Sequence, residues 1–136
     1  MTEEEKNIAI NLLIEKANRN FEQARFLANS GFWDLIVNRL YYSLFHAVTA
    51  LMMQDNIVNK SHKGTAQQFG KHYVMTEKFD KEDGRFYNRL QEKREKADYD
   101  NVFSLSEEEG MELIQKTEAL LTKILNRLIP PFVISN

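Results

Sequence analysis

The stretch from residue 32 to residue 53, FWDLIVNRLYYSLFHAVTALMM, has the strongest hydrophobic pattern in the chain. It contains no glycine or proline, and its apolar positions recur at the spacing of a helix, so the pattern predicts one long helix. One broad apolar stripe of this helix contains Trp33, Ile36, Val37, Leu40, Leu44, Ala47, Val48 and Leu51.

The opposite side of this helix is not polar either. It carries Leu35, Arg39, Tyr42, His46 and Met53, at spacings of four, three, four and seven residues. A helix that is apolar or aromatic nearly all round is buried on both sides. We therefore expect it to run through the middle of a bundle, or between a bundle and a second subunit, with function near its two titratable groups.

Helical periodicity also covers residues 3–29, 61–76, 84–99 and 107–128, and no segment alternates as a strand would. Gly31 suits the left-handed end of the first helix, and Ser61 and Ser106 suit helix starts. The sequence predicts an all-α protein, an up-and-down antiparallel bundle of four to five helices. The predicted domain covers residues 1–129, and residues 130–136 form a C-terminal tail.

The helix predicted at 84–99 has an arginine on its apolar stripe. Phe86, Leu90, Arg94 and Ala97 form this stripe. A lone buried guanidinium is costly, so Arg94 must be paired or face a cavity. Asp98, four residues later on the same side, is the expected partner.

Composition narrows the classes of function. The chain has 136 residues, a net charge of −2 and no cysteine. This charge argues against a broad electrostatic grip on nucleic acid, though not against a local basic pocket. The acidic start does not resemble a signal peptide, and no apolar run reaches the roughly 18 residues that span a membrane. We expect a cytoplasmic protein without membrane contact.

Two groups of residues are candidates for a functional site. One lies on the central helix, and the other lies at the start of the helix that follows. Arg39 and His46 lie two turns apart, so both can reach one phosphate or RNA segment, with Tyr42 between them to stack on a base. His62 and Lys63 fall in the first turn of the third helix, whose free N–H groups attract anions. In the structural alternative for the first group, Arg39 pairs with an acidic residue of another helix, and His46 and Tyr42 fill a dimer seam. In the alternative for the second group, His62 and Lys63 lie at an exposed helix start without a ligand.

A third group contains Arg94, Asp98 and Tyr99. Arg94 could clamp a phosphate, with Asp98 holding it in position, or the pair could be a structural salt bridge. No histidine pair has the spacing of a metal site, and no nucleotide-binding fingerprint occurs, so we expect no metal and no cofactor.

Three motifs together resemble the HEPN domain superfamily, in particular its small stand-alone branch with the layout RAYYAMFHA, SHxG and RxxADY. They are NRLYYSLFHA at 38–47, SHKG at 61–64 and REKADY at 94–99. The resemblance implies a dimerising helical bundle related to the helical domain of aminoglycoside nucleotidyltransferases. It also implies a polar site near the dimer seam and, for many members, a minimal nucleotidyltransferase partner in a toxin–antitoxin module.

Other HEPN proteins are metal-independent ribonucleases with an arginine, a spacer of four to six residues and a histidine late in the bundle. Here no histidine follows Arg94, whereas Arg39 and His46 have the spacing but lie on the second helix. If RNA is cleaved, His46 and Arg94 are the predicted catalytic pair.

Two hypotheses follow from the sequence. In the first, a homodimer binds a nucleotide or RNA through Arg39, Tyr42, His46, His62 and Arg94, and acts with a nucleotidyltransferase. In the second, the chain is a non-catalytic helical dimerisation or interaction module, and the same residues only fix helix packing.

Overall fold

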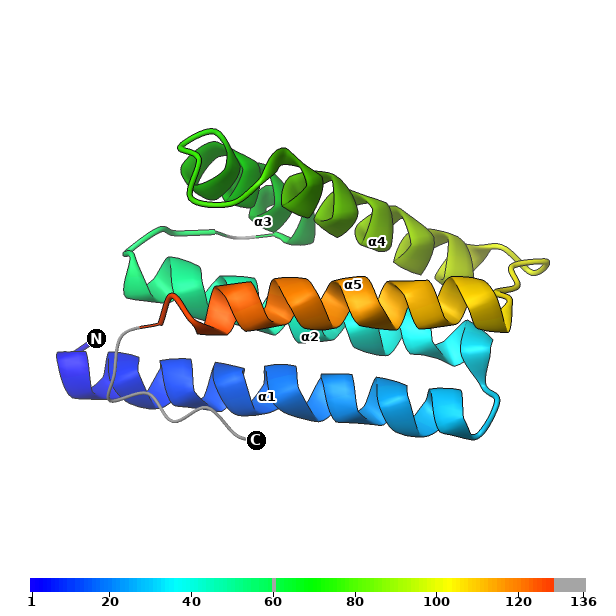
Figure 1. The fold of residues 1–136 in the computed structure, drawn as a ribbon. Coiled ribbons are helices and arrows are strands. Elements are labelled where there is room, and N and C mark those ends of the chain that lie inside the picture. The colour runs from blue at the N-terminus through cyan, green and yellow to red at the C-terminus, as the bar shows by residue number, and fades with distance from the viewer. Residues whose placement is uncertain (60, 129–136) are drawn as a thin grey trace.

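The computed structural model describes residues 1–59 and 61–128, which form helices joined by short turns (Figure 1). The helices are α1 (Glu3–Asn29), α2 (Trp33–Gln54), α3 (His62–Phe69), α4 (Lys81–Tyr99) and α5 (Glu107–Leu125), and a π-helical segment, η1 (Gly70–Val74), follows α3. No strand occurs in this described part of the chain. The all-α prediction is confirmed, and the predicted tail lies outside the described residues.

The helices form one antiparallel bundle. In Figure 1, α1 and α4 run in one direction and α2 and α5 in the other, with α3 and α4 above α2. Helix α2 is central because it contacts α1, α5, α4 and α3. The predicted up-and-down arrangement is therefore confirmed.

A tight turn joins α1 to α2. Gly31 has a φ of +81°, which is the predicted left-handed conformation. The Gly31 N–H donates to the Ala28 carbonyl at 3.0 Å, and the Phe32 N–H donates to the Leu27 carbonyl at 2.9 Å. These two bonds satisfy the last carbonyls of α1 and turn the chain back along it.

The core is built on the predicted stripe of α2. Ile36, Val37, Leu40, Leu44, Ala47 and Val48 are fully buried. Helix α1 contributes Ile10, Ile14, Ala17, Phe21, Ala24 and Ala28, and α5 contributes Leu113, Leu120, Leu121 and Ile124. Burial of this apolar area is the main source of stability for such a bundle.

The second side of α2 is covered less completely than predicted. Arg39, Tyr42, His46 and Met53 are half-buried, but the side chain of Leu35 is 51% exposed. In the single chain, the start of α2 is thus buried on its core side and open at Leu35, and the alternative in which a second subunit covers this side stays a prediction.

Three predicted boundaries differ from the structure, and one of them is the end of α5, at Leu125 rather than at 128. The third helix keeps α-helical bonding only to Phe69, and the Met75 N–H then donates to the Gly70 carbonyl at 2.9 Å, which is a five-residue π-type bond. Helix α4 begins at Lys81 rather than at 84, since the Asp80 N–H donates to the Asp83 carboxylate at 3.0 Å and fixes an earlier start. The helix starts predicted at Ser61 and Ser106 are confirmed, and each serine hydroxyl accepts a backbone N–H three residues on.

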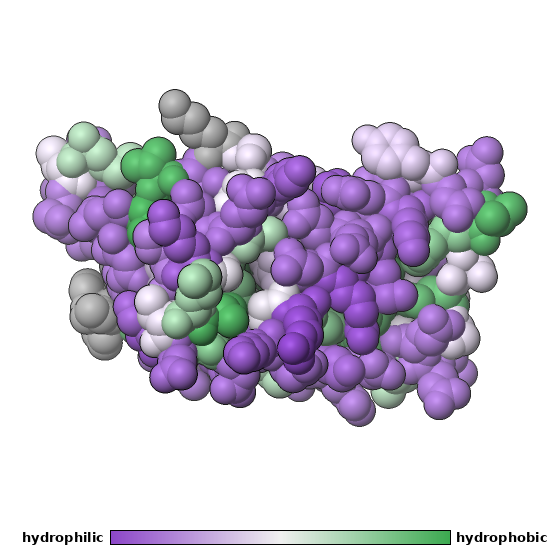
Figure 2. Space-filling view, turned by 90° about the horizontal axis from the view of Figure 1, so that it is seen from above, coloured by the Kyte–Doolittle hydropathy of each residue, from purple (hydrophilic) through white to green (hydrophobic). Residues whose placement is uncertain are grey.

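Figure 2 shows the face seen from above, over α3 and α4. It is mostly hydrophilic, with separate hydrophobic spots. Among the helices of residues 1–59 and 61–128, none has the length and apolar character needed to cross a bilayer.

Candidate functional site

Three aromatic side chains of α2 form the base of the candidate site. Tyr41 is fully buried, whereas Tyr42 and Phe45 are half-buried. The Tyr41 ring meets Tyr42 edge-on at a centroid distance of 5.2 Å and stacks on Phe45 at 5.9 Å. Such aromatic pairs favour a fixed geometry, so α2 presents a rigid ring surface towards α3 and α4.

His62, the first residue of α3, lies on this ring surface. Its Nδ1 is 2.8 Å from the Tyr41 hydroxyl, and its ring stacks on Phe45 with a centroid distance of 4.2 Å and an interplanar angle of 18°. Tyr42 meets the same imidazole edge-on at 5.7 Å. The Ser61 hydroxyl caps α3 by accepting the Gly64 N–H. The backbone of His62 is therefore held by this cap, and its ring is held by the aromatic side chains of α2.

Arg94 on α4 covers the same rings. Its guanidinium carbon lies 4.8 Å from the Tyr41 centroid and 5.8 Å from that of Tyr42, within the range of cation–π attraction. An Nη of Arg94 donates to the Asp98 carboxylate at 3.3 Å, so the predicted pair is present. We call Tyr41, Tyr42, Phe45, His62 and Arg94 the Arg94 cluster.

One donor of Arg94 is left without a partner. The arginine side chain is only 16% exposed, and its Nε is buried with no hydrogen-bond partner. A buried charged donor that is left unsatisfied costs free energy. The guanidinium is therefore held in place by rings and a carboxylate, with donor capacity left over.

Burial sets the protonation of the cluster. It raises the pKa of Tyr41 to about 12, so the hydroxyl stays protonated at neutral pH. Burial, and after it the charge of Arg94, lowers the pKa of His62 below the usual histidine value. When Tyr41 donates to Nδ1, the neutral His62 ring carries its proton on Nε2, which can then donate to a phosphate oxygen.

Arg39 and His46 lie about one turn before and one turn after Tyr42 on α2. The Arg39 guanidinium donates to the side-chain oxygens of Asn38 and of Gln23, the latter at 3.2 Å. His46 meets the Tyr42 ring at a centroid distance of 6.0 Å, and its Nδ1 is buried without a partner. Burial, followed by the charges of Lys16, His62 and Arg39, lowers the pKa of His46.

The structure therefore arranges the candidate residues around Tyr42. His62 and Arg94 belong to one cluster, while His46 and Arg94 both approach Tyr42 without a hydrogen bond between them. Lys63 is exposed and Tyr99 is 86% exposed, so both lie at the edge of the site. Within the described residues, no group of three histidine, aspartate or glutamate side chains is placed to hold a metal ion.

Gly64, the last residue of the SHKG motif, lies in a closely packed first turn of α3. A Cβ at this position would lie 2.5 Å from Asn59 Oδ1 and 2.9 Å from Ser61 Oγ. The connector before α3 packs directly against this turn, so glycine is needed here for close packing.

Sequence reasoning assigned no role to Tyr41, Phe45 and Tyr87. The Tyr87 ring is almost fully buried on α4, and its centroid lies 6.0 Å from that of Tyr41. The sequence did indicate a buried position for Tyr87, because residues 87, 90 and 94 lie on the same side of a helix. Only the packing of α4 on α2 shows that this side meets Tyr41.

The sequence is similar to that of one known protein family. A family model described as "HEPN domain" matches residues 10–128. A Methanocaldococcus jannaschii protein named "Putative toxin" is 37% identical over 117 residues, which cover 86% of this chain and 80% of that protein. A second protein of that name from the same organism is 31% identical over 119 residues, 88% of each chain. A Thermotoga maritima "UPF0332 protein" is 34% identical over 120 residues, 88% of this chain and 91% of its own.

Proposed function

Since the chain belongs to the HEPN domain family, we propose that it is a toxin-like protein that binds a nucleotide or an RNA segment at the Arg94 cluster. The toxin-like part rests on the printed names of two relatives. The binding part rests on the chemistry of the cluster.

One observation carries the proposal: the three motifs, distant in sequence, meet at Tyr41 and Tyr42. His62 and Arg94, which lie on different helices, each contact both rings. A packing role alone does not require a guanidinium with a buried, unsatisfied Nε at that point. A phosphate would bind the Nη groups of this guanidinium, because arginine forks match phosphate oxygens well.

Each residue has a role in this proposal. Arg94 binds a phosphate oxygen, and the Asp98 carboxylate holds the guanidinium in position. His62 donates from Nε2 to the same phosphate. Tyr42, half-buried with Arg94 against its ring, stacks on a base.

A longer RNA segment reaches the other edge of Tyr42. Arg39 contacts a further phosphate there, and His46 is the titratable group beside it. If the protein cleaves RNA, His46 is the expected general base and Arg94 stabilises charge on the phosphorus. Lys63 and Tyr99 are peripheral contacts of such a segment.

The proposal includes two protein partners, a second copy of the chain and a minimal nucleotidyltransferase. Exposed apolar side chains near the α1–α2 turn support a second copy: Phe26 is 70% exposed, and Phe32 and Leu35 are each 51% exposed. Light scattering should give twice the chain mass, and Leu35→Asp should shift it to the monomer. Sequencing the neighbouring genes, and co-purification with a small nucleotidyltransferase that one of them encodes, test the other partner, and the absence of such a gene would contradict it.

The main experiment measures binding and cleavage of RNA without added metal. Fluorescence anisotropy with a labelled single-stranded RNA should give an affinity that Arg94→Ala weakens by about ten- to a hundred-fold, the effect of losing a hydrogen bond to a charged group. Arg85→Ala is the matched control, because Arg85 is on the same helix but its side chain is 68% exposed and paired with Glu82. Cleavage of total cellular RNA by the wild type, and its loss in His46→Ala, would establish the ribonuclease.

The result that contradicts the proposal is equally sharp. If the wild type does not bind RNA or mononucleotides, or if Arg94→Ala and Arg85→Ala behave alike, the cluster is structural. The second hypothesis, a non-catalytic interaction module, then stands, and its signature is a lower melting temperature in Arg94→Ala without any ligand effect.

A further inference from the structure

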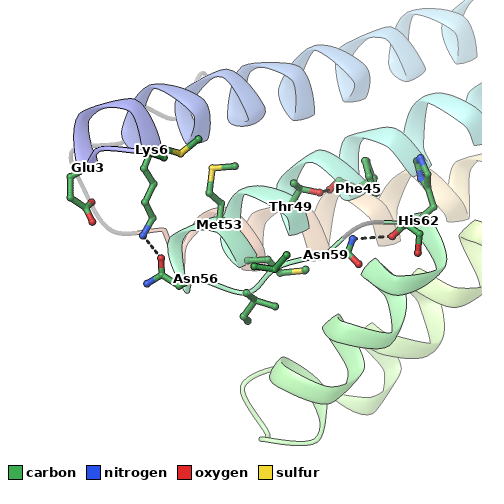
Figure 3. Close-up of a pocket in the computed structure, with 13 residues that line it drawn as sticks. Glu3, Lys6, Phe45, Thr49, Met53, Asn56, Asn59 and His62 are labelled. Atoms are coloured by element: carbon green, nitrogen blue, oxygen red, sulfur yellow. Dashed lines mark hydrogen bonds between the residues drawn. The ribbon is translucent and has the colours of Figure 1, made fainter.

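A groove of about 650 Å³ opens next to the Arg94 cluster (Figure 3). It lies between the start of α1, the second half of α2 and the connector that follows α2. Its apolar lining includes Met1, Met52, Met53, Ile57 and Phe45. We call it the methionine groove.

The two ends of the groove are polar. Figure 3 shows Glu3, Lys6 and Asn56 at one end, Phe45, Asn59 and His62 at the other, and Met53 and Thr49 between them. The Lys6 ammonium donates to Asn56 Oδ1 at 2.9 Å and to the Gln54 carbonyl at 3.3 Å, which ties α1 to the end of α2. These bonds close one end, so a ligand enters along the open length of the groove.

His62 belongs to both the groove and the Arg94 cluster. Its ring stacks on Phe45, which also lines the groove, while its Nδ1 meets the Tyr41 hydroxyl under Arg94. The anion-binding groups of the cluster therefore lie at one end of an apolar trough. A ligand that bridges the two must carry an anionic group next to a flat apolar part.

We propose that the methionine groove binds the base of a nucleotide whose phosphate is held by Arg94 and His62. This inference rests on the proposed function. It places the base of a mononucleotide in the groove, so that in a longer RNA the base on Tyr42 is a neighbouring one. The volume falls within the range of about 300–1,000 Å³ that is typical of small-molecule sites. Methionine thioethers adapt to flat rings and make favourable sulfur–aromatic contacts, which suits Met52 and Met53 as the floor of a base site.

An apolar floor distinguishes one base from another by the ring area that it buries rather than by hydrogen bonds. A purine buries more ring surface than a pyrimidine, so purine nucleotides should bind more tightly. A free nucleotide and the terminal nucleotide of an RNA share this chemistry, and the experiment separates them.

The methionines themselves report on the groove. The chain has five, of which Met1, Met52 and Met53 line it, while Met75 and Met111 lie elsewhere and are 79% and 47% exposed. In a protein labelled with ¹³C at the methionine methyl groups, AMP should shift the NMR signals of Met52 and Met53 and leave those of Met75 and Met111 unchanged. Ribose 5-phosphate, which has the phosphate but no base, should bind at least about tenfold more weakly, a difference of about 1.4 kcal/mol.

A pair of matched variants tests the floor directly. Met53→Gln keeps the length of the side chain but adds an amide. It should weaken the affinity for AMP at least about fivefold without changing the affinity for ribose 5-phosphate. Met75→Gln, outside the groove, should change neither. Tighter binding of AMP than of the trinucleotide ApApA would indicate a free nucleotide, and the reverse order would indicate an RNA end.

Other outcomes overturn the inference. Equal affinities for AMP and ribose 5-phosphate, with no shift at Met52 or Met53, would reject the base site and leave phosphate binding at Arg94 intact. Methionine shifts that depend on protein concentration but not on AMP would place a second copy of the chain in the groove. If AMP, ribose 5-phosphate and inorganic phosphate all fail to bind and Arg94→Ala leaves RNA affinity unchanged, the proposed function fails as well.

Discussion

Helix α2 meets α1 and α5 with one kind of side chain and meets α3 and α4 with another. Towards α1, the Ser43 hydroxyl donates to the Ala17 carbonyl at 2.8 Å among small and aliphatic residues. Towards α5, Ile36 and Trp33 pack on Gly110. Towards α3 and α4, Tyr41 meets His62 and Arg94 instead.

The difference separates stability from recognition within one helix. Aliphatic contacts have no preferred direction and add up over many atoms, so the first region secures the fold. Ring and cation contacts contribute about 0.5–2 kcal/mol each and need fixed geometry. They also leave the buried Arg94 Nε without a hydrogen-bond partner, which the aliphatic contacts of the first region do not.

The largest expected effect is on the aliphatic region. Leu40→Ala removes a fully buried side chain and should lower the free energy of unfolding by about 2–5 kcal/mol. Leu35→Ala, at a side chain that is 51% exposed, should change it by less than about 0.5 kcal/mol. Urea unfolding measures both, and a large loss for Leu35→Ala would show that a second copy covers this residue.

A smaller loss is expected where α5 approaches α2 most closely. A Cβ on Gly110 would lie 2.3 Å from Trp33 Cε3, so Gly110→Ala should destabilise the protein by about 1–3 kcal/mol through overpacking. Gly70→Ala meets nothing within 4 Å and should be neutral or stabilise by up to about 1 kcal/mol. Equal melting temperatures for the two variants would mean that the contact between α2 and α5 yields easily.

Where α2 meets α3 and α4, loss of the Tyr41 hydroxyl should have a modest but measurable effect on stability. Tyr41→Phe removes the bond to His62 Nδ1 and should cost about 1 kcal/mol of unfolding free energy. It should also change the ¹⁵N chemical shifts of the His62 ring, because the bond fixes the tautomer. Tyr99→Phe, on a ring that is 86% exposed, is the control, and identical His62 spectra in both variants would refute this contact.

The smallest expected effect is the pH dependence of the melting temperature that comes from His46 and His62. Burial lowers the pKa of both His46 and His62, so below about pH 6.5 the unfolded chain binds more protons than the folded one. Stability is therefore fully present above that pH and is lost as pH falls through the folded-state pKa values. Melting temperatures from pH 7.5 to 5 should fall less steeply in His46→Gln and His62→Gln than in the wild type. A melting temperature that rises on acidification would contradict the assignment.

Much of the fold was predictable because it depends on local patterns. The apolar stripe of the stretch 32–53 fixed the central helix, and the cap residues Ser61 and Ser106 marked two helix starts correctly. The start of α4 was missed because Asp80 and Glu82 are typical of a turn. In the structure, the Asp83 carboxylate accepts a hydrogen bond from the Asp80 N–H, and the helix begins there. The π-type segment after Phe69 has no sequence signature of its own.

The candidate site was predictable only as a list of residue types. Arg39 and Arg94 stood out equally in the sequence, yet Arg94 lies on two tyrosine rings with a carboxylate, and Arg39 donates to two amide side chains. His46 and His62 differ in the same way, since only His62 receives the Tyr41 hydroxyl. The roles of all these residues in binding stay predictions.

By itself, the sequence determined the helices, the identity of the core and the pairing of Arg94 with Asp98, because periodicity, capping and four-residue spacing act within one segment. Only the tertiary structure decided that Tyr41, His62 and Arg94 meet, and that a methionine-lined groove opens beside them. Those contacts join α2, α3 and α4, and their geometry depends on how the helices pack, which no local pattern specifies.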